Sequence, residues 1–375
     1  MARRVVFLIS DTGGGHRASA SALAEALHSQ HGDALDCQVV DLLTDYAAWP
    51  LNSAADCYEP AINHRLWLWR AGWSAIQNAS FWRAVELLAQ VWQRGGLRRF
   101  AADCRADLYV SVHPLLNRLV RRSLARCHPQ ARFATVVTDL DSAPRQWYDP
   151  GVDLLVAPCP AVQAAALRAG LPASRVRLAG LPIRLQFSQV GLDHRQARAA
   201  LGLAPRPTVL LLGGGAGIGR LEEIALALAP VLAAREGQLA VICGRNDALR
   251  SRLAARRWPL PVRVAGYVDD MPLWMAAADL LVTKAGPGTI AEALACGLPL
   301  VLSGFVPGQE TGNVRYVQEN GVGVYCPDPE QIAAAVADWL EPGNPVLPAL
   351  RARARALARP QAALEIAQAL SALLD

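Results

Sequence analysis

A glycine-rich turn near the amino terminus carries the first side chain that could do acid–base chemistry. Residues 10–16 are Ser-Asp-Thr-Gly-Gly-Gly-His, and they follow an apolar run of strand length. Glycines let the backbone N–H groups of such a turn approach a ligand closely, and His16 then stands where a helix begins. A neutral imidazole can accept a proton from an alcohol. The pattern predicts a ligand-binding loop at Gly14 and Gly15, with His16 as a candidate general base.

The same turn also fits a different class of enzyme. Gly13, Gly15 and Ala18 satisfy the pattern G-x-G-x-x-A, and Asp41 ends the next strand, where the ribose of a dinucleotide would need a carboxylate. A nicotinamide or flavin site is therefore an alternative interpretation, although this fingerprint is weak on its own.

A second turn, at residues 283–289, has the composition of a phosphate site. Its sequence, Thr-Lys-Ala-Gly-Pro-Gly-Thr, ends one strand and begins a helix. Gly286, Gly288, Thr289 and the N–H groups of the first turn could therefore hold a pyrophosphate. Lys284 is the only lysine among 37 basic residues, which indicates a position that requires a compact ammonium group. Glu292 follows about one turn into the helix, where it is suited to accept hydrogen bonds from a ribose diol.

Two further loops provide groups for a sugar or its nucleotide. Residues 304–313, GFVPGQETGN, end in Gln309, Glu310 and Asn313, whose amide and carboxylate groups suit sugar hydroxyls. Helix capping explains one polar residue at this place but not three. Residues 211–219, LLGGGAGIG, form another glycine turn after a strand, and Gly213 and Gly214 are expected to line the ligand cleft.

The segment between residues 49 and 92 holds six of the ten tryptophans. Apolar and aromatic side chains recur there at helical spacing and arginines flank them, which is typical of an amphipathic helix at a lipid interface. Residues 65–99 contain six arginines and one acidic residue, so this segment carries the whole formal charge of +5. A pair of helices packed in a core is the alternative, because aromatic stripes are usually core. The residues expected at the acceptor or at an anionic membrane are Arg65, Arg70, Trp67, Trp69 and Trp73.

Other positions give weaker signals. Asp139-Leu140-Asp141 resembles a D-x-D metal motif, but three residues are little evidence, and no obligatory metal is predicted. His113 ends a strand and is expected to face the ligand cleft, with a structural role as the alternative. The eight cysteines include no C-x-x-C pair, so neither a zinc site nor a disulfide framework is indicated.

These side chains must be positioned by parallel sheets. Apolar runs of strand length alternate with helical segments through residues 3–169 and again through 207–340, which predicts an α/β chain with two Rossmann-like, doubly wound domains. Such domains leave an inter-domain cleft for ligands. The predicted ranges are 1–190 for an acceptor- and membrane-binding domain, 191–345 for a nucleotide-sugar domain, and 346–375 for a closing helix at about 347–374.

The composition argues against several classes of protein. The chain has no stretch of roughly 18 uncharged apolar residues that could span a bilayer. Its first residues lack the features of a secretory signal, and its cysteines fit a reducing compartment, so we expect a peripheral protein on the cytoplasmic side of a membrane. Because the positive charge is local, no nucleic-acid partner is expected.

Taken together, four motifs resemble the monogalactosyldiacylglycerol synthase family of GT-B glycosyltransferases. They are SDTGGGHRASA (10–20), SVHP (111–114), TKAGPGTIAEA (283–293) and GQETGNV (308–314). The resemblance covers most of the chain. It implies an inverting transfer of galactose from UDP-galactose, or of glucose from UDP-glucose, to the free hydroxyl of diacylglycerol, with no obligatory cofactor. A more distant similarity is to the transferase that adds N-acetylglucosamine to the lipid-linked peptidoglycan precursor.

The resemblance also implies roles for single residues. His16 is then the general base or its direct neighbour, and Trp147 lies near the acceptor pocket. Pro144 is a departure, because relatives usually carry a histidine there, and it puts the acceptor wall and its head-group preference in question. The implied ligands of the diphosphate, the ribose and the sugar are, in that order, Gly288 and Thr289, Glu292, and Gln309 and Glu310. Two alternatives stay open: an epimerase of UDP-sugars with this fold, and a non-catalytic sensor of nucleotides or lipids.

Overall fold

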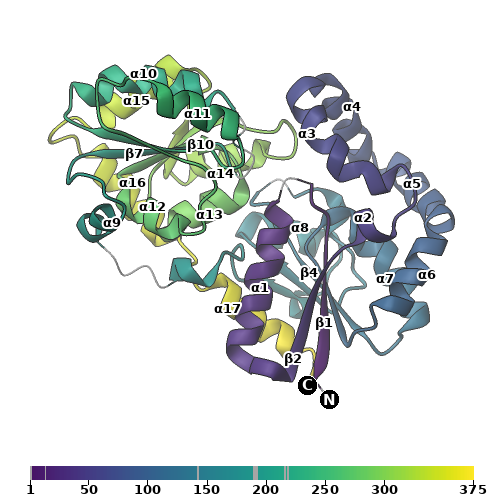
Figure 1. Cartoon of the computed structure of the whole chain (residues 1–375). Coiled ribbons are helices and arrows are strands. Elements are labelled where there is room, and N and C mark those ends of the chain that lie inside the picture. Colours follow the sequence, from purple (N-terminus) through teal and green to yellow (C-terminus); the bar gives the residue numbers. More distant parts are fainter. Residues whose placement is uncertain (1, 13, 142, 189–192, 215–216, 218) are drawn as a thin grey trace. The chain divides into compact units, whose positions relative to one another are not determined.

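The computed structural model describes residues 2–12, 14–141, 143–188, 193–214, 217 and 219–375, and the chain forms two compact units (Figure 1). Unit 1 comprises Met1–Leu185, Pro307–Gly312 and Gln361–Asp375, whereas unit 2 comprises Gln186–Val306 and Asn313–Pro360. Two short segments late in the sequence, Pro307–Gly312 and Gln361–Asp375, therefore belong to unit 1. The three ranges predicted from the sequence do not assign these segments to the first domain. One of them is the loop that carries Gln309 and Glu310.

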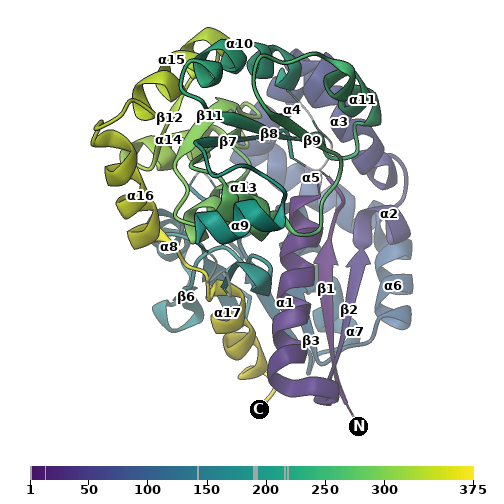
Figure 2. The same cartoon turned by 60° about the vertical axis from the view of Figure 1, so that its left-hand side comes forward.

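Unit 1 is built on a sheet of six parallel strands, in the order β2-β1-β3-β4-β5-β6. This confirms the first Rossmann-like domain. Five consecutive apolar residues of β1 are fully buried, as expected for a strand covered on both faces (Figures 1 and 2). The strands are β1 (Arg3–Ile9), β2 (Leu35–Asp41), β3 (Leu108–Ser111), β4 (Arg132–Val136), β5 (Leu154–Ala157) and β6 (Val176–Leu178).

Four helices of unit 1 follow one another in the tryptophan-rich region between β2 and β3, where the sequence predicts an amphipathic helix or a packed helix pair (Figure 2). These four are α3 (Ala54–His64), α4 (Leu66–Gln77), α5 (Ala79–Trp92) and α6 (Arg94–Asp103). Within the described residues, no helix of either unit is both long enough and apolar enough to cross a membrane. The other helices of unit 1 are α1 (Gly15–His31), α2 (Leu42–Tyr46), α7 (Asn117–Cys127), α8 (Pro160–Arg168) and α17 (Ala362–Ser371).

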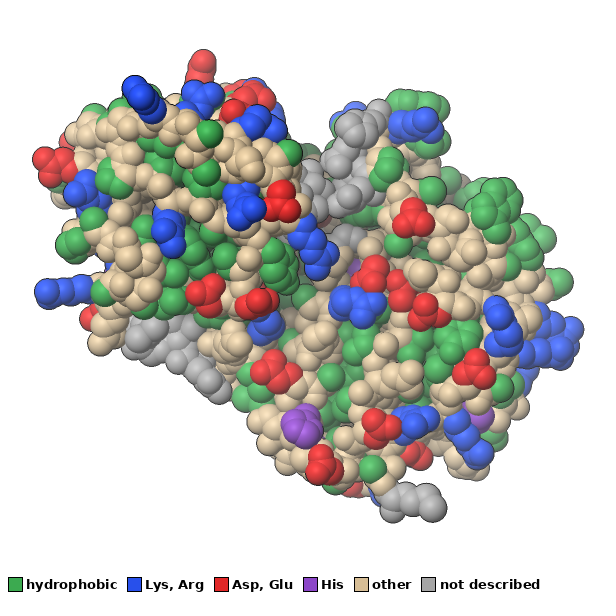
Figure 3. Space-filling model, viewed as in Figure 1, with side chains coloured by type: hydrophobic (Ala, Val, Ile, Leu, Met, Phe, Trp, Pro, Cys, Tyr) green, Lys and Arg blue, Asp and Glu red, His purple; other side chains and the backbone are tan. Residues whose placement is uncertain are grey.

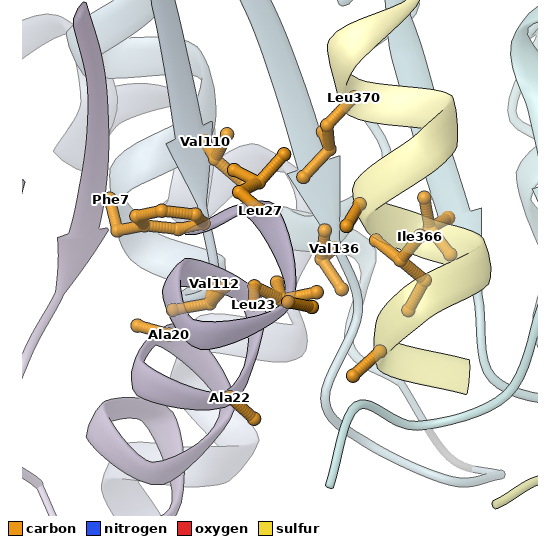
Figure 4. Close-up of a cluster of buried hydrophobic side chains, with 14 of the residues drawn as sticks. Phe7, Ala20, Ala22, Leu23, Leu27, Val110, Val112, Val136, Ile366 and Leu370 are labelled. Atoms are coloured by element: carbon orange, nitrogen blue, oxygen red, sulfur yellow. The ribbon is translucent and has the colours of Figure 1, made fainter. Parts of the chain in front are cut away.

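The end of the chain differs from the single closing helix predicted at about 347–374. The structure has two helices, α16 (Val346–Leu357) in unit 2 and α17 in unit 1. Pro360 explains the break, because proline lacks an N–H group and keeps the residue before it out of helical conformation. Figure 4 shows α17 beside α1, where Ile366 and Leu370 lie with Leu23, Leu27, Val110 and Val136 in the hydrophobic core.

Unit 2 contains a second sheet of six parallel strands, in the order β12-β11-β10-β7-β8-β9, and this confirms the second Rossmann-like domain. Its strands are β7 (Thr208–Leu212), β8 (Gln238–Ile242), β9 (Val262–Ala265), β10 (Leu280–Lys284), β11 (Leu300–Gly304) and β12 (Gly323–Tyr325). Its remaining helices are α9 (His194–Ala200), α10 (Leu221–Ala233), α11 (Asp247–Ala255), α12 (Met271–Ala277), α13 (Pro287–Ala295), α14 (Thr311–Glu319) and α15 (Pro329–Trp339).

Candidate functional site

Three neighbouring strands of unit 1 bring the candidate base and its partners together. β1, β3 and β4 are adjacent and parallel, so the residues that follow their carboxyl ends meet at one edge of the sheet. His16 follows β1, His113 follows β3 and Thr138 follows β4. The Nδ1 atom of His16 lies 3.1 Å from Oγ1 of Thr138, and the rings of His16 and His113 meet edge to face with centroids 4.7 Å apart.

Thr138 connects His16 to the strand beside it. The hydroxyl of Thr138 donates to the carbonyl oxygen of Val112 at 3.5 Å, and its oxygen lies within hydrogen-bond distance of Nδ1 of His16. A proton on Nδ1 suits this arrangement, and in that tautomer Nε2 is the acceptor. Burial lowers the pKa of His16 to about 4, against smaller opposing effects of a hydrogen bond to Val112 and of the charge of Asp11. The imidazole is therefore neutral at physiological pH.

His113 has a supporting position beside His16. Its Nδ1 accepts a hydrogen bond from the backbone N–H of Leu115 at 3.4 Å, and its Nε2 lies 3.4 Å from Oγ1 of Thr12. Burial and the neighbouring His16 ring keep its pKa well below the usual value. Because both ring nitrogens have partners, this geometry fits the structural alternative for His113 better than a role in proton transfer.

Asp139 is a second buried titratable group in unit 1. Its Oδ2 atom accepts a hydrogen bond of 2.6 Å from Nε1 of Trp147, whose side chain is completely buried. Burial raises the pKa of Asp139 to about 6, the Trp147 hydrogen bond opposes this rise, and the charge of Glu310 adds to it. The sequence singled out Asp139 only within a metal motif, whereas the structure makes it a carboxyl that titrates near neutrality.

The loop Pro307–Gly312 places Gln309 and Glu310 in unit 1. Glu310 is buried, and Oε1 of Gln309 accepts a hydrogen bond of 3.0 Å from the hydroxyl of Tyr58 on α3. Burial, then the charges of Glu310 and Asp139, raise the pKa of Tyr58 far above its usual value, so its hydroxyl keeps its proton and remains a donor. Tyr58 did not stand out in the sequence, because it lies 251 positions from its partner.

In unit 2, Lys284 is the last residue of β10 and precedes α13, in the strand-to-helix order that the phosphate motif predicts. A Cβ atom built on Gly286 would be 3.4 Å from Nζ of Lys284 and 3.8 Å from Oγ1 of Thr289, so these groups surround one point. A Cβ atom on Gly214 would be 3.7 Å from Cε of Lys284, which brings the turn after β7 to the same place. No side chain caps α13. The arrangement can bind a diphosphate, because a helix amino terminus and an ammonium group both favour anions.

The other predicted donor ligands lie around the same helix. Glu292 is on α13, and Asn313 is on α14, where its Nδ2 donates a hydrogen bond of 2.8 Å to the carbonyl oxygen of Ala285. Its Oδ1 atom is buried and has no hydrogen-bond partner within the described part of the chain, so it can accept one from a ligand. Gly213 follows β7 directly, and part of the loop that it begins (215, 216 and 218) is outside the described residues.

The glycines show where a ligand has room. A Cβ atom on Gly15 or on Gly288 would meet nothing within 4 Å, so the backbone at both helix starts is open to an approaching group. Gly14 has a φ of +73°, a conformation that favours glycine. Gly13 lies outside the described residues.

The tryptophan-rich helices divide their side chains between two environments. Trp67 is 72% exposed, whereas Trp69 and Trp73 are half-buried and pack against the loop that begins at Pro307. Figure 3 shows hydrophobic side chains gathered over α5 and basic side chains near the edge of α6. The exposed large apolar residues of α5 are Phe81, Leu87, Leu88, Val91 and Trp92, and the exposed arginines of the segment are Arg65, Arg70, Arg83, Arg94, Arg98 and Arg99.

The alternative dinucleotide site is not supported by the position of Asp41. Its Oδ2 accepts a hydrogen bond from the backbone N–H of Asp11 at 3.0 Å, and its Oδ1 caps α2 by accepting one from Thr44 at 3.1 Å. This carboxylate holds the turn after β1, and each of its oxygens already accepts a backbone hydrogen bond. In the described residues, no three His, Cys, Asp or Glu side chains form a group that could hold a metal ion.

The fold is shared with solved glycosyltransferases. The chain is similar to MurG of Acinetobacter baumannii (16% identity, 99% of each chain, TM-score 0.64). It is also similar to the calicheamicin glycosyltransferase CalG4 (15% identity, 100% of this chain and 98% of that one, TM-score 0.62). Anabaena HepE in complex with UDP-glucose has a TM-score of 0.54 at 15% identity, over 99% of this chain and all of that one. The two Rossmann-like units therefore have the architecture of GT-B glycosyltransferases.

The family follows from sequence comparison. Residues 16–183 match the family model of monogalactosyldiacylglycerol (MGDG) synthase, and residues 208–363 match that of the glycosyltransferase family 28 C-terminal domain. Probable monogalactosyldiacylglycerol synthase 2, chloroplastic, of Oryza sativa subsp. indica is 42% identical over 97% of this chain and 79% of its own length. Monogalactosyldiacylglycerol synthase 3, chloroplastic, of Arabidopsis thaliana is 37% identical over 97% and 80%. The chain belongs to the monogalactosyldiacylglycerol synthase family.

Proposed function

We propose that this protein transfers galactose, or glucose, from a UDP-sugar to the free hydroxyl of diacylglycerol, with inversion at the anomeric carbon. The observation that carries the proposal is the buried, neutral His16, which lies at the carboxyl edge of the unit 1 sheet with Nδ1 3.1 Å from Oγ1 of Thr138. The names of the relatives support the acceptor and the sugar. The UDP-glucose complex of a protein with the same fold supports the type of donor.

The reaction needs one proton acceptor and one stabilised leaving group. In the proposed step, the acceptor hydroxyl oxygen forms a bond to the anomeric carbon as the bond from that carbon to the UDP oxygen breaks. Nε2 of His16 takes the hydroxyl proton. Lys284 and the N–H groups that begin α13 offset the charge that develops on UDP, which is work that a metal ion does in other enzymes. We therefore expect no obligatory cofactor.

We assign the diphosphate, the ribose and the sugar of the donor to the predicted ligands whose chemistry suits each of them. Gly288, Thr289 and Lys284 bind the diphosphate, with Gly213, Gly214 and Gly286 allowing it to come close. Glu292 accepts hydrogen bonds from the ribose. Gln309 and Glu310 bind the sugar hydroxyls, and Asn313 adds its buried Oδ1 as a further acceptor. Gly14 and Gly15 are also predicted to bind the donor, and their open backbone leaves room next to His16.

One experiment distinguishes transfer of the sugar to lipid from the two alternatives, an epimerase and a non-catalytic sensor. The protein is incubated with labelled UDP-galactose and with labelled UDP-glucose in turn, each with diacylglycerol vesicles, and the lipids are resolved by thin-layer chromatography. We expect label in a monoglycosyl lipid from at least one donor. A changed UDP-sugar without labelled lipid would establish an epimerase instead, and binding of UDP-sugar and vesicles without any product would establish a sensor.

We also propose that the protein works as a peripheral protein on the cytoplasmic side of a membrane, and that α4 and α5 dock on anionic lipid. The exposed apolar residues of α5 would enter the interface, and the arginines would meet the head groups. Each arginine near such a surface contributes about 1 kcal/mol. Changing Arg65, Arg70, Arg94, Arg98 and Arg99 to Gln should therefore weaken co-sedimentation with phosphatidylglycerol vesicles more than about tenfold.

The matched control removes the same charge elsewhere. Five arginines of unit 2 are exposed and are also changed to Gln: Arg250, Arg252, Arg256, Arg257 and Arg263. This variant should bind vesicles nearly as well as the unchanged protein, because its arginines lie outside the tryptophan-rich segment. Equal losses in the two variants would mean that only total charge matters, and persistent binding of the first variant would refute docking by these arginines.

A further inference from the structure

We infer that Tyr58 and Trp69 are positioning residues for the sugar-binding loop, and that docking of α4 and α5 on lipid fixes this loop for the donor sugar. The inference rests on the proposed function, because it takes Gln309 and Glu310 as sugar ligands. It adds a connection between the membrane-facing helices and the donor site, and every contact that carries it lies within unit 1.

Two hydrogen bonds attach the loop Pro307–Gly312 to α3 and α4. The indole Nε1 of Trp69 donates to the carbonyl oxygen of Pro307 at 2.9 Å, and the hydroxyl of Tyr58 donates to Oε1 of Gln309 at 3.0 Å. The second bond orients the amide of Gln309, because it fixes the side on which the amide oxygen lies. Its NH₂ group is then the part that can donate to a sugar hydroxyl.

An aromatic cluster forms the surface on which this loop lies. The rings of Tyr58 and Trp69 meet edge to face with centroids 5.4 Å apart, and Trp69 and Trp73 are 5.8 Å apart. Gly308 has a φ of +84°, and a Cβ atom there would be 2.3 Å from Cδ1 of Trp73. The backbone of the loop therefore rests directly on the indole of Trp73, in a conformation that favours glycine.

Other side chains of α4, and many of the next helix, α5, face solvent. Trp67 on α4 is 72% exposed, and Leu88 and Val91 on α5 are 70% and 76% exposed. Neither α4 nor α5 contains a fully buried residue, so few contacts hold these helices to the rest of unit 1. A lipid surface that binds the exposed side chains would restrict the motion of these helices. Through Trp69 and Tyr58 it would also restrict the motion of the loop.

Removing one hydrogen-bond donor at a time tests the connection. Trp69→Phe and Tyr58→Phe keep the aromatic ring and remove the N–H or O–H group. We expect each to raise the KM for the UDP-sugar about threefold to tenfold, as for the loss of one hydrogen bond, with little change in kcat. The dissociation constant for UDP, which has no sugar, should stay the same, as should binding to phosphatidylglycerol vesicles.

Matched controls exist in the same unit. Trp82→Phe removes an indole hydrogen bond to Oε1 of Glu86 on α5, and Tyr46→Phe removes a hydroxyl that lies 3.4 Å from Sγ of Cys104. Neither of these two interactions involves the loop, so both variants should keep the KM of the unchanged protein. The inference is refuted if the controls raise the KM as much as Trp69→Phe, or if Trp69→Phe weakens UDP binding by the same factor as UDP-sugar binding.

The effect of lipid is measured by binding alone. In the His16→Ala background, which should hold the donor with little turnover, we expect phosphatidylglycerol vesicles to increase the affinity for UDP-galactose or UDP-glucose severalfold. They should leave the affinity for UDP unchanged, and Trp69→Phe should abolish the increase. An equal increase in the two backgrounds would overturn the inference. Because no product is measured, this result is independent of whether diacylglycerol is the acceptor, so failure of the inference and failure of the proposed function remain distinguishable.

Discussion

Replacement of His16 by alanine should lower kcat by about 10²- to 10⁴-fold, which is the usual contribution of a positioned general base. The dissociation constant for UDP should not change, because the proposed ligands of the diphosphate and the ribose are other residues, namely Lys284, Gly288, Thr289 and Glu292. Steady-state transfer to lipid and calorimetric titration with UDP measure the two quantities. His28→Ala is the matched control, because this histidine is exposed on the same helix and should be dispensable. Near-normal turnover of His16→Ala would disprove the base assignment.

The pH dependence of kcat/KM identifies which group takes the proton. Burial disfavours the charged imidazolium, so His16 with a pKa of about 4 stays a neutral base when the pH falls below the ordinary histidine value of 6.5. Activity should therefore be lost only as the pH approaches about 4. Asp139, with a pKa raised to about 6, would lose its charge earlier. An acidic limb near pH 6, together with loss of turnover in Asp139→Asn, would transfer the role of base to Asp139.

Replacement of Lys284 by methionine should weaken UDP binding by about 10- to 100-fold, because hydrogen bonds to charged groups contribute about 1.5–3 kcal/mol. Lys284→Arg should not restore the affinity. The backbones of Gly214 and Gly286 come within a few ångströms of the lysine side chain, which leaves little room for the larger planar guanidinium.

Binding of uridine distinguishes residues that bind the ribose from residues that bind the diphosphate. Uridine has the ribose but no diphosphate, so Lys284→Met should leave its affinity unchanged, whereas Glu292→Gln should weaken uridine and UDP alike. Isothermal titration with both ligands provides the measurement. If Lys284→Met weakened uridine as much as UDP, the lysine would not be a diphosphate ligand and its effect on the site would be structural.

Much of the fold could be predicted because its strands are buried on both faces. Continuous apolar runs such as that of β1 identify such strands without any other information. Strand β6 (Val176–Leu178) was missed, because only Val176 of its three residues is buried and the pattern is too short to notice. Pro360 could have indicated the break between the last two helices.

Less of the candidate site than of the fold could be predicted from the sequence. His16 and Lys284 stand out through their motifs, whereas Thr138 and Tyr58 gain significance only from what they contact. The tryptophans of α4 recur at a spacing that suits a lipid interface or a packing surface equally, and only the structure shows that Trp69 and Trp73 pack on a loop from the other end of the chain. The low pKa of His16 depends on burial, which no local pattern reveals.

The position of α17 has a consequence for how the protein is made. Ile366 and Leu370 complete the same core as Leu23 and Leu27, although more than 300 residues of translation separate them (Figure 4). While the ribosome is still adding the intervening residues, the apolar side chains of α1 that α17 later covers stay exposed. Such surface can bind chaperones or aggregate. The amino-terminal half therefore reaches its final packing only after the last helix has emerged, and a nascent chain that ends early leaves α1 uncovered.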